Sequence, residues 1–105
     1  MTERIRLPNR RASTSFDFAS QGLRFTATVS LFGDGRLAEI FLMNHKAGSM
    51  AGINACDAAV VCSIALQYGV PLDVIRKALM RDSAGNASGP LGTALDLLLA
   101  SNNSP

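Results

Sequence analysis

The 105-residue sequence has no tryptophan, one tyrosine, one histidine and two cysteines, and only 17% of its residues are charged. With 6% aromatic residues, it offers little for a stacking platform that binds nucleic-acid bases. Cys56 and Cys62 lack the Cys-x-x-Cys spacing of zinc or redox sites, and one histidine makes no metal-ligand cluster. We therefore expect no metal and no cofactor, and we expect both cysteines to be small buried thiols.

Signals for membranes and for export are missing as well. No run of 18 or more apolar residues is present, which argues against a membrane-spanning helix. The beginning of the chain has no apolar segment of the kind that a secretory signal peptide needs. Together with the scarcity of cysteine, this favours a cytoplasmic protein.

What the sequence does contain is a high apolar fraction, 48%, in a length that suits one domain. We expect residues 1–13 to be a flexible basic arm, residues 14–100 a single domain and residues 101–105 a frayed tail. The basic character of the arm comes from Arg4, Arg6, Arg10 and Arg11. Such an arm is either a solubilising tail or a binding site for phosphate backbones, so nucleic-acid binding is an alternative function.

Hydropathy alternation predicts an antiparallel sheet. Residues 23–31 alternate apolar and polar side chains, as in a strand with one face in water. The hairpin signal Gly-Asp-Gly at 33–35 leads to a return strand over 37–43, and residues 14–19 could add a third strand. The return strand is apolar on both faces, which indicates helices on one side and a second subunit on the other. The second face carries Leu37, Phe41 and Met43.

Three helices are predicted after the sheet, over 50–68, 71–81 and 90–100. The first is apolar almost all round, so we expect more than one neighbour to bury it. The fold class is α+β, with an antiparallel sheet of two or three strands packed on this long central helix and two shorter helices. A sheet this small leaves a face and edges to cover, so we expect a homodimer or higher homo-oligomer that uses either one.

The loop that precedes the first helix is the best candidate for a binding site. Lys46, Gly48 and Ser49 place a positive charge and free backbone N–H groups at a helix N-terminus, which favours an anion such as a nucleotide. His45 stands beside them. The glycine pattern of a P-loop is absent, and an ordinary capped helix start explains the same residues.

A catalytic reading is the third alternative. Glu39, His45 and Asp57 could converge at a subunit interface, where acid–base catalysis would need them within hydrogen-bonding reach. Motifs of serine hydrolases, zinc proteases and dinucleotide-binding enzymes are absent from the sequence.

From Gly22 to about Arg81 the sequence resembles the TSCPD domain, a small module found at the C-terminal end of adenosylcobalamin-dependent (class II) ribonucleotide reductases and as short bacterial proteins. The resemblance rests on residues 25–29 (FTATV), 34–41 (DGRLAEIF), 46–49 (KAGS) and 63–71 (SIALQYGVP). Residues 89–92 (GPLG) and 95–98 (LDLL) resemble the short bacterial members.

The resemblance implies a relationship to ribonucleotide reductase, with the reductase or a nucleotide as a partner, but no catalytic residue is carried over. The Thr-Ser-Cys-Pro-Asp run that names the family and the cysteine-rich tail are missing here, and the chain is too short for the barrel of the radical chemistry. A non-catalytic accessory or ligand-binding module is therefore the leading expectation.

Overall fold

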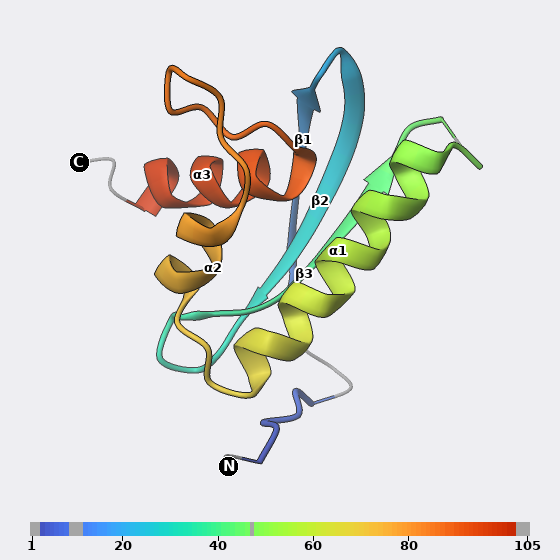
Figure 1. The fold of residues 1–105 in the computed structure, drawn as a ribbon. Helices are drawn as coiled ribbons and strands as arrows, with labels where there is room; N and C mark the ends of the chain where they lie inside the picture. Colours follow the sequence, from blue (N-terminus) through green and yellow to red (C-terminus); the bar gives the residue numbers. More distant parts are fainter. Residues whose placement is uncertain (1–2, 9–11, 47, 103–105) are drawn as a thin grey trace.

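The computed structural model describes residues 3–8, 12–46 and 48–102. It contains a three-stranded antiparallel sheet of order β1-β2-β3, followed by three helices (Figure 1). The elements are β1 (Thr14–Ser20), β2 (Leu23–Leu31), β3 (Leu37–Asn44), α1 (Met50–Gln67), α2 (Leu72–Ala78) and α3 (Pro90–Asn102). The predicted α+β class is confirmed, and the sheet has the third strand that the sequence left open.

Strand register divides the sheet into a core face and an open face. Phe18 of β1 pairs with Phe25 of β2, and their stacked rings, 5.6 Å apart, lie on the core face. Figure 1 shows the three helices on one side of the sheet, with α1 running alongside β3. The buried core consists mainly of Phe18, Phe25, Ala27, Val29, Leu37, Ile40, Leu42, Ala55, Ala59, Cys62, Leu66, Leu91, Ala94 and Leu95.

The predicted apolar surface of Leu37, Phe41 and Met43 does not form as one face. Phe41 and Met43 are exposed on the open face, but Leu37 is 9% exposed and belongs to the core. The pairing shifts register between Ser30 and Leu31, which pair with Glu39 and Leu37. One extra residue in β3 reverses the side to which the chain points, and this bulge turns Leu37 inward.

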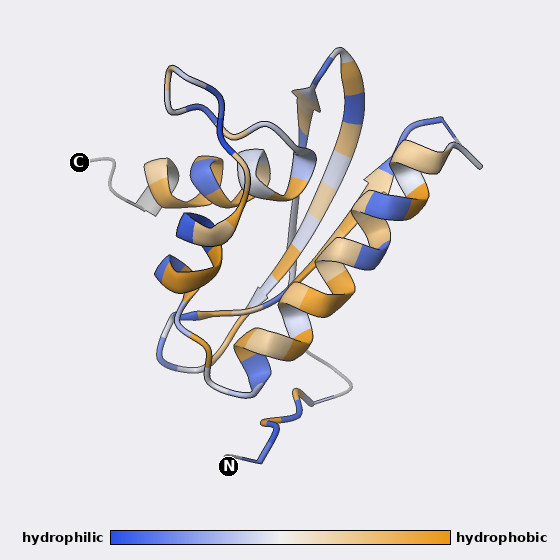
Figure 2. Cartoon of the chain, in the orientation of Figure 1, coloured by the Kyte–Doolittle hydropathy of each residue, from blue (hydrophilic) through white to orange (hydrophobic). Residues whose placement is uncertain are grey.

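Helix α1 is central in the sequence but covered on one side only. Its inner residues, including Ala55, Ala59 and Leu66, are buried against the sheet. Its outer surface exposes Met50, Ile53, Val60, Val61, Ile64 and Tyr68. Hydrophobic colour dominates the helix in Figure 2. The expectation that several neighbours bury α1 is wrong, because α1 packs mainly on β3, with a small contact to α3, and no described element covers its outer surface.

One further expectation about this helix, that both cysteines are buried, needs correction. Cys62 is buried, and burial raises the pKa of its thiol to about 11, but Cys56 is exposed because it lies away from the sheet. By length and composition alone, the 18-residue helix is apolar enough to cross a membrane, with 33% of it buried in the fold. Its apolar residues do not form an uninterrupted run, because Asn54 and Asp57 lie among them.

Side chains of α1 also cover the outer edge of β3. The buried Ser63 hydroxyl donates to the Ile40 carbonyl at 2.8 Å and accepts from the Ile40 N–H at 2.9 Å. The Gln67 side-chain amide donates to the Ala38 carbonyl at 3.2 Å. These backbone groups are therefore unavailable to another strand, which blocks this part of the β3 edge.

Candidate functional site

The loop before α1 is built around the side chains of Asn44 and Ser49. Of the two candidates for the N-cap, Gly48 and Ser49, the structure uses Ser49, whose hydroxyl accepts from the Gly52 N–H at 3.0 Å. Asn44 accepts from the Lys46 N–H at 2.9 Å, which holds the loop in a tight turn. A Cβ on Gly52 would lie 2.9 Å from the Asn44 Cβ, so only glycine permits this approach of the helix to the strand.

Lys46 and the helix N-terminus give this end of the molecule a positive potential. The Lys46 side chain is exposed, and the first turn of α1 contains no acidic residue. Gly48 has a φ of 77°, which bends the chain from the lysine into the helix. The first N–H groups of a helix have no partner within it and carry a partial positive charge, so this end can attract an anion.

His45 does not join this group. Its imidazole Nε2 lies 2.9 Å from the Thr26 hydroxyl, and Thr26 is on the open face of β2, opposite Met43. The Asn44 side chain, one residue earlier, points to the other side of the sheet, towards Ser49. The alternation of side chains along an extended chain therefore separates His45 from the helix N-terminus.

On the open face, His45 belongs to a chain of hydrogen bonds with Thr26 and Asp17. The Thr26 hydroxyl donates to Asp17 Oδ1 at 2.6 Å, so it accepts from His45 Nε2–H. His45 Nε2 lies 3.8 Å from the same carboxylate. Because the hydroxyl proton of Thr26 points to Asp17 and not to His45, His45 is not positioned to act as a base for this hydroxyl. The sequence does not predict the group of Asp17, Thr26 and His45, because these residues are far apart in the chain and only the pairing of the strands brings them together.

Within one chain, Glu39, His45 and Asp57 are not brought together, and their convergence at a subunit interface stays a prediction. Glu39 is 5% exposed on β3, whereas Asp57 is exposed on α1, which packs on the opposite face of the sheet. The structure brings His45 to Asp17 and Thr26, not to either of these carboxylates. In the part of the chain that is described, no three His, Cys, Asp or Glu side chains group as a metal site.

Part of the basic arm is held against the domain. Arg4 Nε donates to the Gln67 side-chain oxygen at 2.7 Å, and the Ile5 N–H donates to the Gln67 carbonyl at 2.8 Å. The arm therefore caps the C-terminal end of α1, and Arg6 remains exposed there. Arg10 and Arg11 lie outside the described residues. Because Arg4 is engaged within the fold, the nucleic-acid alternative gains no support here.

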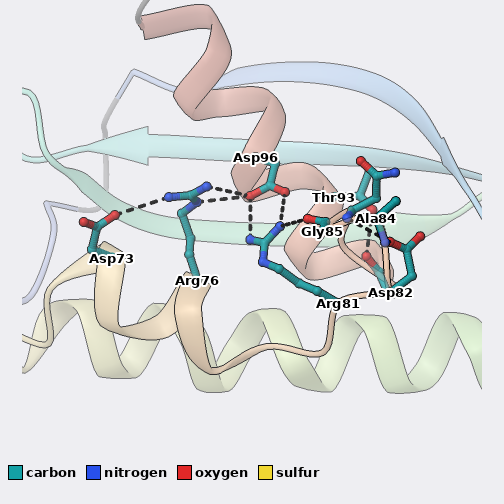
Figure 3. Close-up of polar contacts among 10 residues, drawn as sticks. Asp73, Arg76, Arg81, Asp82, Ala84, Gly85, Thr93 and Asp96 are labelled. Carbon is teal, nitrogen blue, oxygen red and sulfur yellow. Dashed lines mark hydrogen bonds and ion pairs between the residues drawn. The ribbon is translucent and has the colours of Figure 1, made fainter.

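The strongest electrostatic cluster was not foreseen from the sequence. Asp96 of α3 accepts from Arg81 at 2.7 and 2.9 Å and from Arg76 at 2.9 and 3.1 Å (Figure 3). Hydrogen bonds from Arg81 lower the pKa of Asp96 to about 2, against an opposing effect of burial. Asp73 also pairs with Arg76 at 3.2 Å, so two carboxylates balance two arginines. Arg81 bonds the Gly85 carbonyl as well, and the cluster thus fastens α2 and its following loop to α3.

A large groove lies at the other end of the sheet from Lys46. Its volume is about 1090 Å³, between the β2–β3 hairpin, the turn after α1 and the end of α3. Its lining is mainly apolar and includes Leu31, Phe32, Leu37, Val70, Leu72 and Leu98. The groove therefore adds nothing to an anion site at the N-terminus of α1.

Comparison with known proteins relates this chain to a segment of vitamin B12-dependent ribonucleotide reductases. The reductase of Agrobacterium fabrum is 39% identical over 71 residues, 68% of this chain and 6% of the reductase. Those of Rhodopirellula baltica and Bradyrhizobium diazoefficiens are 42% and 37% identical over 72 and 73 residues, which are 7% and 6% of their lengths. No family model and no solved structure matches the chain.

Proposed function

We propose that this chain is a non-catalytic accessory module of a ribonucleotide reductase system, and that it binds an anion such as a nucleotide beside Lys46, Gly48 and Ser49. The observation that carries the proposal is the match to vitamin B12-dependent reductases, which extends over about 70% of the chain at 37–42% identity. The same match spans only 6–7% of the length of each reductase, so this module corresponds to a short segment of those proteins.

A binding role fits two hydroxyl groups that are engaged in hydrogen bonds within the fold. The Thr26 hydroxyl bonds Asp17 and His45 on the open face, and the buried Ser63 hydroxyl bonds the backbone of β3. We also propose that the module acts in the cytoplasm, in keeping with its scarcity of cysteine.

The electrostatics of the α1 N-terminus support an anionic ligand. Lys46 supplies a mobile exposed charge, and the uncapped N–H groups of the first turn supply fixed partial charges. Ser49 already caps one of these donors, so a ligand would meet Lys46 and the remaining N–H groups. A phosphate group matches this combination because it offers several acceptor oxygens with full charge.

Isothermal calorimetry with adenosine and guanosine nucleotides and with inorganic phosphate tests the site. We expect Lys46→Ala to weaken binding by about tenfold, which corresponds to one charge-assisted hydrogen bond. Lys77→Ala is the matched control, because Lys77 is an exposed lysine on α2. Equal affinity of the wild type and Lys46→Ala, or no binding by either, would remove the anion site from the proposal.

A further inference from the structure

The outer surface of α1 has the spacing of a helix-pairing seam. Met50, Ile53, Asp57, Val60 and Ile64 follow one another at intervals of three and four residues, the repeat of helices that pack side by side. The four apolar members are 68, 48, 40 and 37% exposed, and Val61 beside them is 67% exposed. In the described structure no other element covers this seam.

The open face of the sheet has a different character. Ser15 bonds Thr28 at 2.9 Å, and Thr26 bonds both Asp17 and His45. These polar side chains satisfy one another and stay exposed, as expected of a surface that faces water. The open face also exposes Phe41 and Met43 of β3, at 44 and 70%, but these lie beside the polar network, whereas every member of the seam except Asp57 is apolar. The seam on α1 is therefore the more continuous apolar surface, and it is the one that we expect a partner to cover.

We propose that a second copy of this chain packs its α1 antiparallel against this seam. The charge distribution favours this occupant and this direction. Asp57 is the only charged residue in α1, and a parallel pair would place the two Asp57 carboxylates side by side. An antiparallel pair can place Asp57 opposite Tyr68 of the second copy, which separates the two carboxylates by ~16 Å along the helix axis.

This alignment gives each Asp57 a partner. The Tyr68 ring is 42% exposed, and its hydroxyl can donate to the carboxylate of the other copy. The arm is fixed at the same helix end by the bond from the Ile5 N–H to the Gln67 carbonyl at 2.8 Å. Its exposed Arg6 thus adds a positive charge near the Asp57 of the second copy.

The alignment also closes on itself. A twofold axis halfway between Asp57 and Tyr68 brings Val61 of one copy to Ile64 of the other, and the reverse contact follows by symmetry. Val60 extends this apolar centre. Because both copies bury the same surface in this contact, no seam remains exposed for a third copy, and the assembly is a dimer.

Sedimentation velocity on the full chain at about 50 μM tests the proposal, and we expect a dimer. Val61→Glu should give a monomer, because it places two carboxylates in the apolar centre. Val74→Glu is the matched control and should remain a dimer, since Val74 is a valine that is 57% exposed on α2. Tyr68→Phe should raise the dimer dissociation constant by about tenfold or more, because it removes two hydrogen bonds to charged groups. Circular dichroism checks that each variant is folded.

A monomeric wild type, including one that binds phospholipid vesicles through α1, would overturn the proposal. A dimer that survives Val61→Glu but dissociates on Phe41→Glu would also overturn it, and would assign the interface to the sheet. Nucleotide calorimetry on Val61→Glu separates this question from the proposed function, because Lys46 and Ser49 lie at the far end of the helix from Tyr68.

Discussion

The open face of the sheet and the outer face of α1 are both exposed, but only the sheet face holds a network of polar side chains. Thr26, Thr28, Ser15 and Asp17 bond one another across β1 and β2, beside the exposed Phe41 and Met43 of β3. The helix face presents Ile53, Val60, Val61 and Ile64 to solvent. The sequence patterns predicted that a second subunit would cover the apolar return strand and that the long helix would be buried. The comparison teaches that the number of apolar residues in an element does not tell which of them are exposed, because packing decides which side of the element is covered.

The largest difference in the free energy of unfolding is expected between replacements of two neighbouring residues of β2 that point to opposite sides of the sheet. Phe25 is 1% exposed in the core, and Phe25→Ala should lower the free energy of unfolding by about 3–5 kcal/mol. Thr26→Val on the open face should change it by less than about 0.5 kcal/mol. Urea unfolding at one protein concentration measures both. A large effect at Thr26 would mean that the open face supports the fold, contrary to the comparison.

The covered edge of β3 provides the next test. Ser63→Ala should cost about 2–3 kcal/mol, because it leaves the buried N–H and C=O of Ile40 without their partner. Ser15→Ala makes the same substitution on the open face, where water replaces the bond to Thr28, and should cost about 0.5 kcal/mol or less. Equal destabilisation by the two variants in urea unfolding would contradict the role of α1 as cover for this edge.

The smallest effect is expected at the α2–α3 cluster, away from both faces. Asp96→Asn should cost about 1–2 kcal/mol at neutral pH, since the arginines lower the pKa of Asp96 from 3.8 to about 2. A lowered carboxyl pKa stabilises the fold above the unfolded pKa, so the difference from wild type should shrink below about pH 4 and vanish near pH 2.

Urea unfolding at several pH values measures this change, with Asp73→Asn as the control. Asp73 bonds only Arg76 and its side chain is 67% exposed, so its replacement should have little effect at any of these pH values. A wild-type and Asp96→Asn difference that persists at pH 2 would show that the arginines are not its source.

Most of the elements could be predicted from local pattern. Alternation fixed β2, the cap at Ser49 began α1, and Gly69, with a φ of 95°, ended it. The Lys46 loop was found because lysine, glycine and a cap residue stand together in the chain. The group of Asp17, Thr26 and His45 could not be found this way, since only strand register brings these residues together.

By itself, the sequence determined the α+β class, the order of strands and helices and the relationship to a reductase segment, because these depend on periodicity and short motifs. Tertiary structure decided which surfaces meet water. A single bulge directs Leu37 into the core. Helix α1 packs on the sheet with one side only, so its outer face stays exposed. Asp96 of α3 bonds Arg76 of α2 and Arg81, which follows α2. Each of these outcomes depends on contacts between residues far apart in the chain, which local pattern does not encode.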